Sequence, residues 1–201
     1  MLLEVNESQL VLVDYQDGLM PVIDEGSQVL ANAQRLAQIA HRLKVPVWGT
    51  EQNPDKLGCN DPVIRSHCIK TLSKMAFSAA GAGLMDCLLP AADAPKGNSR
   101  SLPRHLQKLN PPPALDRTTI VMGGCEAHIC LLQTALELLE QELSVWVVTD
   151  ACGSRTERNR DAAFDRLASA GAELVTTEMV AFEWLRSAEH PAFRDVLAMI
   201  K

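Results

Sequence analysis

Aromatic residues and long apolar runs are both scarce in this sequence. Aromatic side chains make up 4% of its 201 residues, so little surface is present to stack against a flat ring. No apolar run approaches the roughly 20 residues of a membrane-spanning helix, and the chain does not open with the basic and then apolar segments of a secretory signal. These absences predict a cytoplasmic protein with no membrane partner.

Basic residues are outnumbered by acidic ones. Lys and Arg total 19 against 25 Asp and Glu, which gives a formal net charge of -6 and an isoelectric point near 5.4. The basic residues are scattered along the chain, whereas nucleic-acid binding needs them gathered on one face. The composition therefore argues against a nucleic-acid partner and favours a small-molecule substrate.

The six cysteines show neither a disulfide framework nor a metal motif. A chain of this length and apolar content forms its core without disulfides. Cys125, His128 and Cys130 offer three soft ligands, but a structural zinc site needs four, and no second C-x2-C pair follows. The C-x4-C spacing also differs from the C-x-x-C motif of disulfide oxidoreductases. We therefore predict no metal and no other cofactor.

Apolar segments of strand length alternate with segments of helical periodicity. The predicted strands are 9–13, 45–50, a weaker one at 68–72, 118–122, 144–149 and 172–175. The predicted helices are 27–43, 128–141, 157–170 and 179–187. This alternation predicts a doubly wound, Rossmann-like α/β fold, in which a mainly parallel sheet lies between two helical layers. With no internal repeat or shift in composition, residues 1–201 are expected to form a single domain.

Two segments interrupt this alternation. Residues 52–66 contain turn signals and are expected to form a long loop over a functional site. Residues 91–113 are rich in Pro and basic residues and are expected to form an exposed insertion with one short helix at 101–109. The insertion and the apolar tail at 196–200 are candidates for contacts with a second subunit.

The carboxyl ends of the first and fourth strands are the expected position of the site, because ligands bind in doubly wound sheets where the strand order reverses. Asp14 follows the first strand, and Cys130 lies in the first turn of a helix after the fourth. A helix N-terminus favours the thiolate, so we expect a lowered pKa for Cys130. The alternatives are a small packed cysteine and an Asp14 that caps a helix or a loop.

Several motifs resemble those of the isochorismatase-like cysteine hydrolases in order and spacing. They are Asp14-Tyr15-Gln16, Ser73-Lys74 with Phe77-Ser78, and Gly124-Cys125-Glu126-Ala127-His128-Ile129-Cys130. Further segments resemble the isochorismatase domain-containing branch of that family: Thr50-Glu51-Gln52-Asn53-Pro54, Asp150-Ala151-Cys152-Gly153-Ser154-Arg155 and His190-Pro191-Ala192-Phe193.

The resemblance implies a catalytic triad. Cys130 would be the nucleophile, Asp14 the general base and Lys74 the cation that stabilises both anions, with Lys70 as the rival lysine. It also implies a cis peptide at Cys125–Glu126 that aims the backbone N–H groups of Glu126 and Cys130 at an oxyanion. Candidates for the substrate pocket are Gln16, Gln52, Phe77, Ala127 and His128, and His128 is equally well read as a structural histidine.

This sequence differs from two related groups of enzymes, and the differences limit the reactions that we expect it to catalyse. Nicotinamidases of the superfamily carry an Asp-x-His metal pattern after the second strand, where this chain has Thr50-Glu51-Gln52. Isochorismatases that cleave a vinyl ether can dispense with the cysteine, so Cys130 favours hydrolysis of an amide or related C–N bond through a thioester. The alternative is an inactive family member that acts as a binding or scaffold protein. The resemblance further implies a homodimer or homotetramer, while the substrate stays open.

Overall fold

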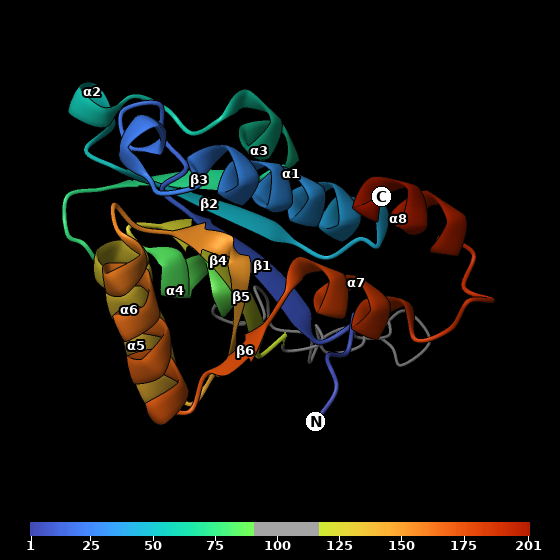
Figure 1. The fold of residues 1–201 in the computed structure, drawn as a ribbon. Helices are drawn as coiled ribbons and strands as arrows, with labels where there is room; N and C mark the ends of the chain where they lie inside the picture. Colours follow the sequence, from blue (N-terminus) through green and yellow to red (C-terminus); the bar gives the residue numbers. More distant parts are fainter. Residues whose placement is uncertain (91–116) are drawn as a thin grey trace, which may run out of the picture.

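The fold is built on one parallel sheet. The computed structural model describes residues 1–90 and 117–201. Its six strands lie in the order β3-β2-β1-β4-β5-β6, and every neighbouring pair is parallel (Figure 1). The strands are β1 (Ser8–Val13), β2 (Val47–Gln52), β3 (Lys70–Lys74), β4 (Thr119–Cys125), β5 (Ser144–Gly153) and β6 (Glu173–Val175). The predicted doubly wound α/β fold is confirmed.

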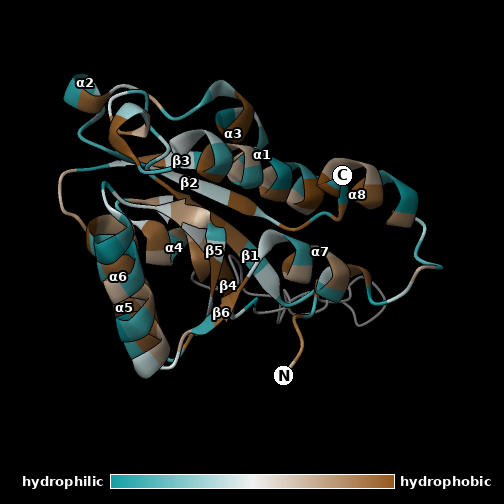
Figure 2. Ribbon diagram, viewed as in Figure 1, coloured by the Kyte–Doolittle hydropathy of each residue, from teal (hydrophilic) through white to brown (hydrophobic). Residues whose placement is uncertain are grey.

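Helices cover both faces of the sheet (Figure 1). One face carries α1 (Gly26–Arg42), α3 (Pro62–His67), α7 (Thr177–Leu185) and α8 (Phe193–Ile200), and the other carries α4 (Leu84–Leu88), α5 (Leu132–Glu140) and α6 (Glu157–Ser169). Figure 2 shows apolar residues concentrated along the strands between these two layers. None of the helices in the described ranges is long and apolar enough to cross a membrane.

The central strand β1 shows why its sequence is a continuous apolar run. All six of its residues are buried. Leu10 and Leu12 point into the core beneath α1, whereas Val11 and Val13 point into the core beneath α5. Because successive side chains of a strand alternate between faces, a strand covered on both sides needs apolar residues at every position.

Some predicted boundaries need correction. Residues 52–66 are not one irregular loop, because they contain the short helices α2 (Pro54–Leu57) and α3. Asp61 starts α3 by accepting hydrogen bonds from the backbone of Val63 (2.9 Å) and Ile64 (3.3 Å), with Pro62 in the first helical turn. The insertion predicted at 91–113 and its helix at 101–109 lie outside the described residues.

The strand order reverses at β1, as the sequence analysis predicted. Val13 is in register with Thr50 of β2 on one side and with Gly124 of β4 on the other. Asp14, the next residue, therefore lies beside the ends of both neighbours. The turn that leads to Cys130 starts directly after β4, so the topology brings Asp14 and Cys130 to the same edge of the sheet.

Close contact between β1 and β4 depends on a glycine. A Cβ atom on Gly124 would lie 2.7 Å from the Val13 Cβ and 3.0 Å from the Val13 carbonyl oxygen. We expect Gly124→Ala to lower the free energy of unfolding by about 1–3 kcal/mol, the usual cost of overpacking, in urea unfolding followed by circular dichroism.

Gly81 is the matched control, because no described heavy atom lies within 4 Å of a Cβ at that position. Gly81→Ala should leave the free energy of unfolding unchanged or slightly higher. If Gly124→Ala were as stable as wild type, the two strands would not approach each other as closely as the structure shows.

Candidate active site

A buried ion pair lies at the centre of the site. Lys74 Nζ donates to Asp14 Oδ2 at 2.7 Å, and neither side chain is exposed. Asp14 Oδ1 accepts a hydrogen bond from Thr50 Oγ1, also at 2.7 Å. Asp14 has a left-handed backbone (φ 56°), which is uncommon for a non-glycine residue and needs support from its surroundings. Both carboxylate oxygens are therefore held in place.

Lys74 is the last residue of β3 and has a second partner. Its Nζ donates to Gln52 Oε1 at 2.9 Å, and Gln52 is the residue opposite it on β2. The amide nitrogen of Gln52 donates in turn to the Met75 carbonyl oxygen at 2.8 Å. Lys70, the rival lysine, is exposed at the other end of β3. The geometry therefore selects Lys74 as the partner of Asp14.

Cys130 lies in a π-helical turn, Ala127–Leu131, that leads into α5. Its side chain is buried, and its carbonyl oxygen accepts a hydrogen bond from Thr134 Oγ1 at 2.7 Å. Burial and then the Asp14 carboxylate raise the pKa of the Cys130 thiol to about 12, although Lys74 acts in the opposite direction. The expected lowering of this pKa is wrong, because desolvation and a neighbouring anion outweigh the helix N-terminus.

The turn before Cys130 differs from the expectation in one respect. The structure has no cis peptide within the described residues, so the cis bond expected at Cys125–Glu126 is absent. The turn instead begins at Glu126, which adopts a left-handed conformation (φ 51°, ψ 60°). The predicted oxyanion donors, the backbone N–H groups of Glu126 and Cys130, stay a prediction.

The pocket candidates fall in different environments. Gln16 is fully buried, and its side chain bonds to backbone groups of Gln52 and Gly58, so it orders the chain next to Lys74. Ala127 is fully buried, whereas Phe77 is largely exposed. His128 is partly buried, and its Nδ1 lies 3.0 Å from Ser154 Oγ.

Sequence reasoning gave no role to several residues that the structure brings to this edge. Thr50 binds Asp14, and its signal was a hydroxyl at the end of a buried strand. Arg155, which follows β5, pairs through Nε with Glu126 Oε1 at 2.8 Å. Its partner is far away in the sequence, so no local pattern indicates this contact.

The position of the nicotinamidase metal pattern is occupied by other contacts. Glu51 Oε1 accepts a hydrogen bond from the backbone of Asn60 at 2.8 Å and lies 3.6 Å from Arg65. Gln52 binds Lys74, as described above. Across residues 1–90 and 117–201, no group of three or more His, Cys, Asp or Glu side chains is arranged to hold a metal ion.

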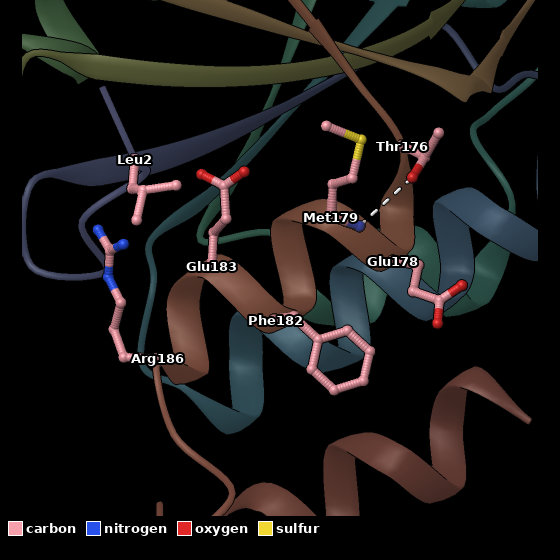
Figure 3. A pocket seen from close by; sticks show the side chains of 7 residues that line it. All are labelled: Leu2, Thr176, Glu178, Met179, Phe182, Glu183 and Arg186. Carbon is pink, nitrogen blue, oxygen red and sulfur yellow. Dashed lines mark hydrogen bonds between the residues drawn. The ribbon is translucent and has the colours of Figure 1, made fainter.

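A surface cavity of about 450 Å³ lies away from this site (Figure 3). It is lined by Leu2 and by residues at and after the start of α7, including Phe182 and Arg186. Leu2 precedes β1 and Asp14 follows it, so the length of the strand separates the cavity from the ion pair. Its apolar and charged lining contains none of the predicted catalytic residues.

Comparison with known proteins now identifies the family. The model of the isochorismatase domain matches residues 101–179. Isochorismatase domain-containing protein 2A of Mus musculus is 32% identical over 194 residues, which cover 96% of this chain and 82% of the mouse protein. The chain belongs to the isochorismatase family. Its membership supports a hydrolase activity.

Solved structures share the isochorismatase-family fold along the whole chain. The MAR1 ribonuclease of Caenorhabditis elegans superimposes with a TM-score of 0.83 at 27% identity, covering 100% of this chain and 92% of the other. The YcaC gene product of Escherichia coli, described as an octameric hydrolase of unknown specificity, gives a TM-score of 0.77 at 21% identity, with 100% and 96% covered. The latter likeness concerns the fold alone.

The opposing effects of Asp14 and Lys74 on this thiol are directly measurable. Because the thiolate is the reactive form, a raised pKa moves the midpoint of iodoacetamide labelling to higher pH. In wild type, labelling of Cys130 should keep rising well past the free-thiol pKa of about 8.5. Asp14→Asn removes a negative charge and should lower the midpoint, whereas Lys74→Met should raise it.

Peptide mass spectrometry at a series of pH values gives the midpoints. Lys70→Met is the control, because it removes an exposed lysine from the same strand and should leave the midpoint unchanged. An unchanged or higher midpoint in Asp14→Asn would show that the carboxylate does not act on the thiol.

Proposed function

We propose that this protein is a cysteine hydrolase that cleaves an amide or related C–N bond of a small molecule. The observation that carries this proposal is the fully buried Lys74–Asp14 ion pair, which acts on the thiol of Cys130. A buried ion pair adds little net stability, since desolvating two charges offsets most of their attraction. Titratable groups arranged in this way are typical of catalytic sites.

The arrangement supports a reaction in two stages. Asp14 takes the Cys130 proton as Sγ attacks the substrate carbonyl carbon, and the backbone N–H groups of Glu126 and Cys130 stabilise the oxyanion. The tetrahedral intermediate collapses, and the leaving amine takes the proton from Asp14. Water then attacks the Cys130 thioester as Asp14 takes its proton. Collapse of this second intermediate releases the acid, and the proton passes from Asp14 to Cys130 Sγ, which restores the thiol. No cofactor enters this scheme.

The raised pKa of Cys130 supports proton transfer during the attack. With its pKa at about 12, the thiol is protonated at neutral pH. A thiol–thiolate pre-equilibrium is then unfavourable, so a base must accept the proton as the S–C bond forms. Asp14 is the neighbouring base that accepts this proton. Lys74 stabilises the negative charge on the Asp14 carboxylate or on the Cys130 sulfur.

The relatives bring in one further candidate substrate. The Caenorhabditis elegans structure is named a ribonuclease, which raises RNA as an alternative. The net charge of -6 argues against a polyanionic substrate, because binding RNA depends on neutralising its phosphates. A small amide is therefore the preferred substrate class, and an inactive binding or scaffold protein is the alternative from another class.

We expect hydrolysis of at least one member of a panel of small aliphatic and aromatic primary amides, measured by ammonia release. Cys130→Ala should abolish turnover, and Asp14→Asn should lower it by about 10²–10⁴-fold, the usual contribution of a general base. Asp14→Asn should nevertheless react faster with iodoacetamide, since its thiol has a lower pKa. This opposite response separates a base from a merely structural carboxylate.

The same panel tests the alternatives. A single-stranded RNA oligonucleotide should remain intact, and its cleavage by Cys130→Ala would argue for a different site. If no amide is hydrolysed and Cys130 forms no adduct at any pH, the proposal of a cysteine hydrolase fails and the binding or scaffold function is favoured.

We further propose that residues 1–201 form one domain that assembles as a homo-oligomer in the cytoplasm. The strands on both sides of residues 91–116 form one sheet, and the Escherichia coli neighbour is described as an octamer. Val196 of the C-terminal tail is fully buried within its own chain, so the tail as a whole is not free for a partner. The oligomeric state is directly measurable. Light scattering after size exclusion should give a mass of two or four chains, and a monomer at micromolar concentration would contradict the proposed homo-oligomer.

A further inference from the structure

A second ion pair lies on the β5 side of the turn that carries Cys130. Arg155 Nε donates to Glu126 Oε1 at 2.8 Å. The side chain of Arg155 is 54% exposed, but that of Glu126 is only 9% exposed. This pair joins the segment after β5 to the residue at which the chain leaves β4, and so it links two elements across the sheet edge.

The other carboxylate oxygen of Glu126 is poorly satisfied. Within the described residues, Oε2 has no hydrogen-bond partner. His128 Nδ1 is 3.3 Å from it but is also 3.0 Å from Ser154 Oγ. A buried carboxylate with one unsatisfied oxygen is costly, and without Arg155 this side chain would keep only the longer contact with His128.

The backbone of Glu126 also needs support. Its left-handed conformation (φ 51°) is unfavourable for a residue with a Cβ atom. The Glu126 carbonyl oxygen accepts a hydrogen bond from Ile129 N at 2.8 Å, which starts the helical turn of Cys130. Glu126 is therefore held by its carboxylate, through Arg155, and by its backbone carbonyl, through Ile129. These two contacts together set the direction of the Glu126 N–H group.

We propose that Glu126, clamped by Arg155, is a positioning residue that aims the backbone N–H groups of the turn at the oxyanion of the reaction. This inference rests on the proposed function, because it assigns a support to the oxyanion donors of that mechanism. Oxyanion donors act only when they are preorganised, and a small displacement of one of them has a large effect on rate.

A pair of reagents separates turn position from thiol reactivity. p-Nitrophenyl acetate acylates a thiol through a tetrahedral oxyanion and releases p-nitrophenolate, leaving an acetyl thioester on Cys130. Iodoacetamide alkylates the same sulfur by displacement of iodide and forms no tetrahedral intermediate. The ratio of the two rates at Cys130, with the background of Cys130→Ala subtracted, therefore reports on oxyanion stabilisation alone.

We expect Arg155→Gln to lower the acylation rate about 10-fold or more, while alkylation stays within about twofold of wild type. Arg155→Lys keeps a cation near Glu126 and should recover much of the loss. Arg42→Gln is the matched control, because Arg42 Nε makes the same 2.8 Å contact with Asp195, whose side chain is 55% exposed. Its two rates should both equal those of wild type.

A double-mutant cycle completes the test. Glu126→Ala should reproduce the loss seen in Arg155→Gln, and the two changes together should lower acylation no further. An unchanged ratio in Arg155→Gln would overturn the positioning role while leaving the cysteine hydrolase proposal intact. Equal losses in both rates would also overturn it, since they indicate general loosening. A wild-type Cys130 that is not acylated would reject both proposals.

Discussion

The Lys74–Asp14 ion pair is the interaction on which the rest of the site depends. Both side chains are fully buried, so removing either partner leaves the other as a costly unpaired charge. Thr50 donates a hydrogen bond to the second oxygen of Asp14, and Gln52 accepts one from Lys74. Because these partners come from three adjacent parallel strands, the register of β1, β2 and β3 has to be correct before the pair can form.

Burial and this ion pair together set the protonation state of the Cys130 thiol. Burial has the largest effect and raises the pKa of the thiol, the Asp14 carboxylate raises it further, and Lys74 lowers it. The thiol is therefore kept neutral next to a carboxylate that can accept its proton. A permanently ionised thiolate would react with any electrophile. In the proposed mechanism, the sulfur anion forms only as a substrate carbonyl is attacked.

The sequence predicted those features that follow from local residue patterns and from the order of strands and helices. The apolar run of β1 predicted a strand covered on both faces, and the alternation of elements predicted the sheet and the edge at which Asp14 and Cys130 meet. The pKa of Cys130 was predicted in the wrong direction, because burial and a neighbouring charge are properties of the assembled site. The Glu126–Arg155 contact was missed for the same reason, since it joins segments from different strands.

The proposed nucleophile, Cys130, is thus supported by two ion pairs of different character. Lys74–Asp14 is fully buried and is screened little by salt, whereas Arg155 is half exposed and its attraction to Glu126 weakens as salt is added. The first pair acts on the pKa of the Cys130 thiol, and the second is proposed to act through the backbone of the turn. Ionic strength should therefore change the acylation of Cys130 more than its alkylation, because only acylation depends on the position of the turn.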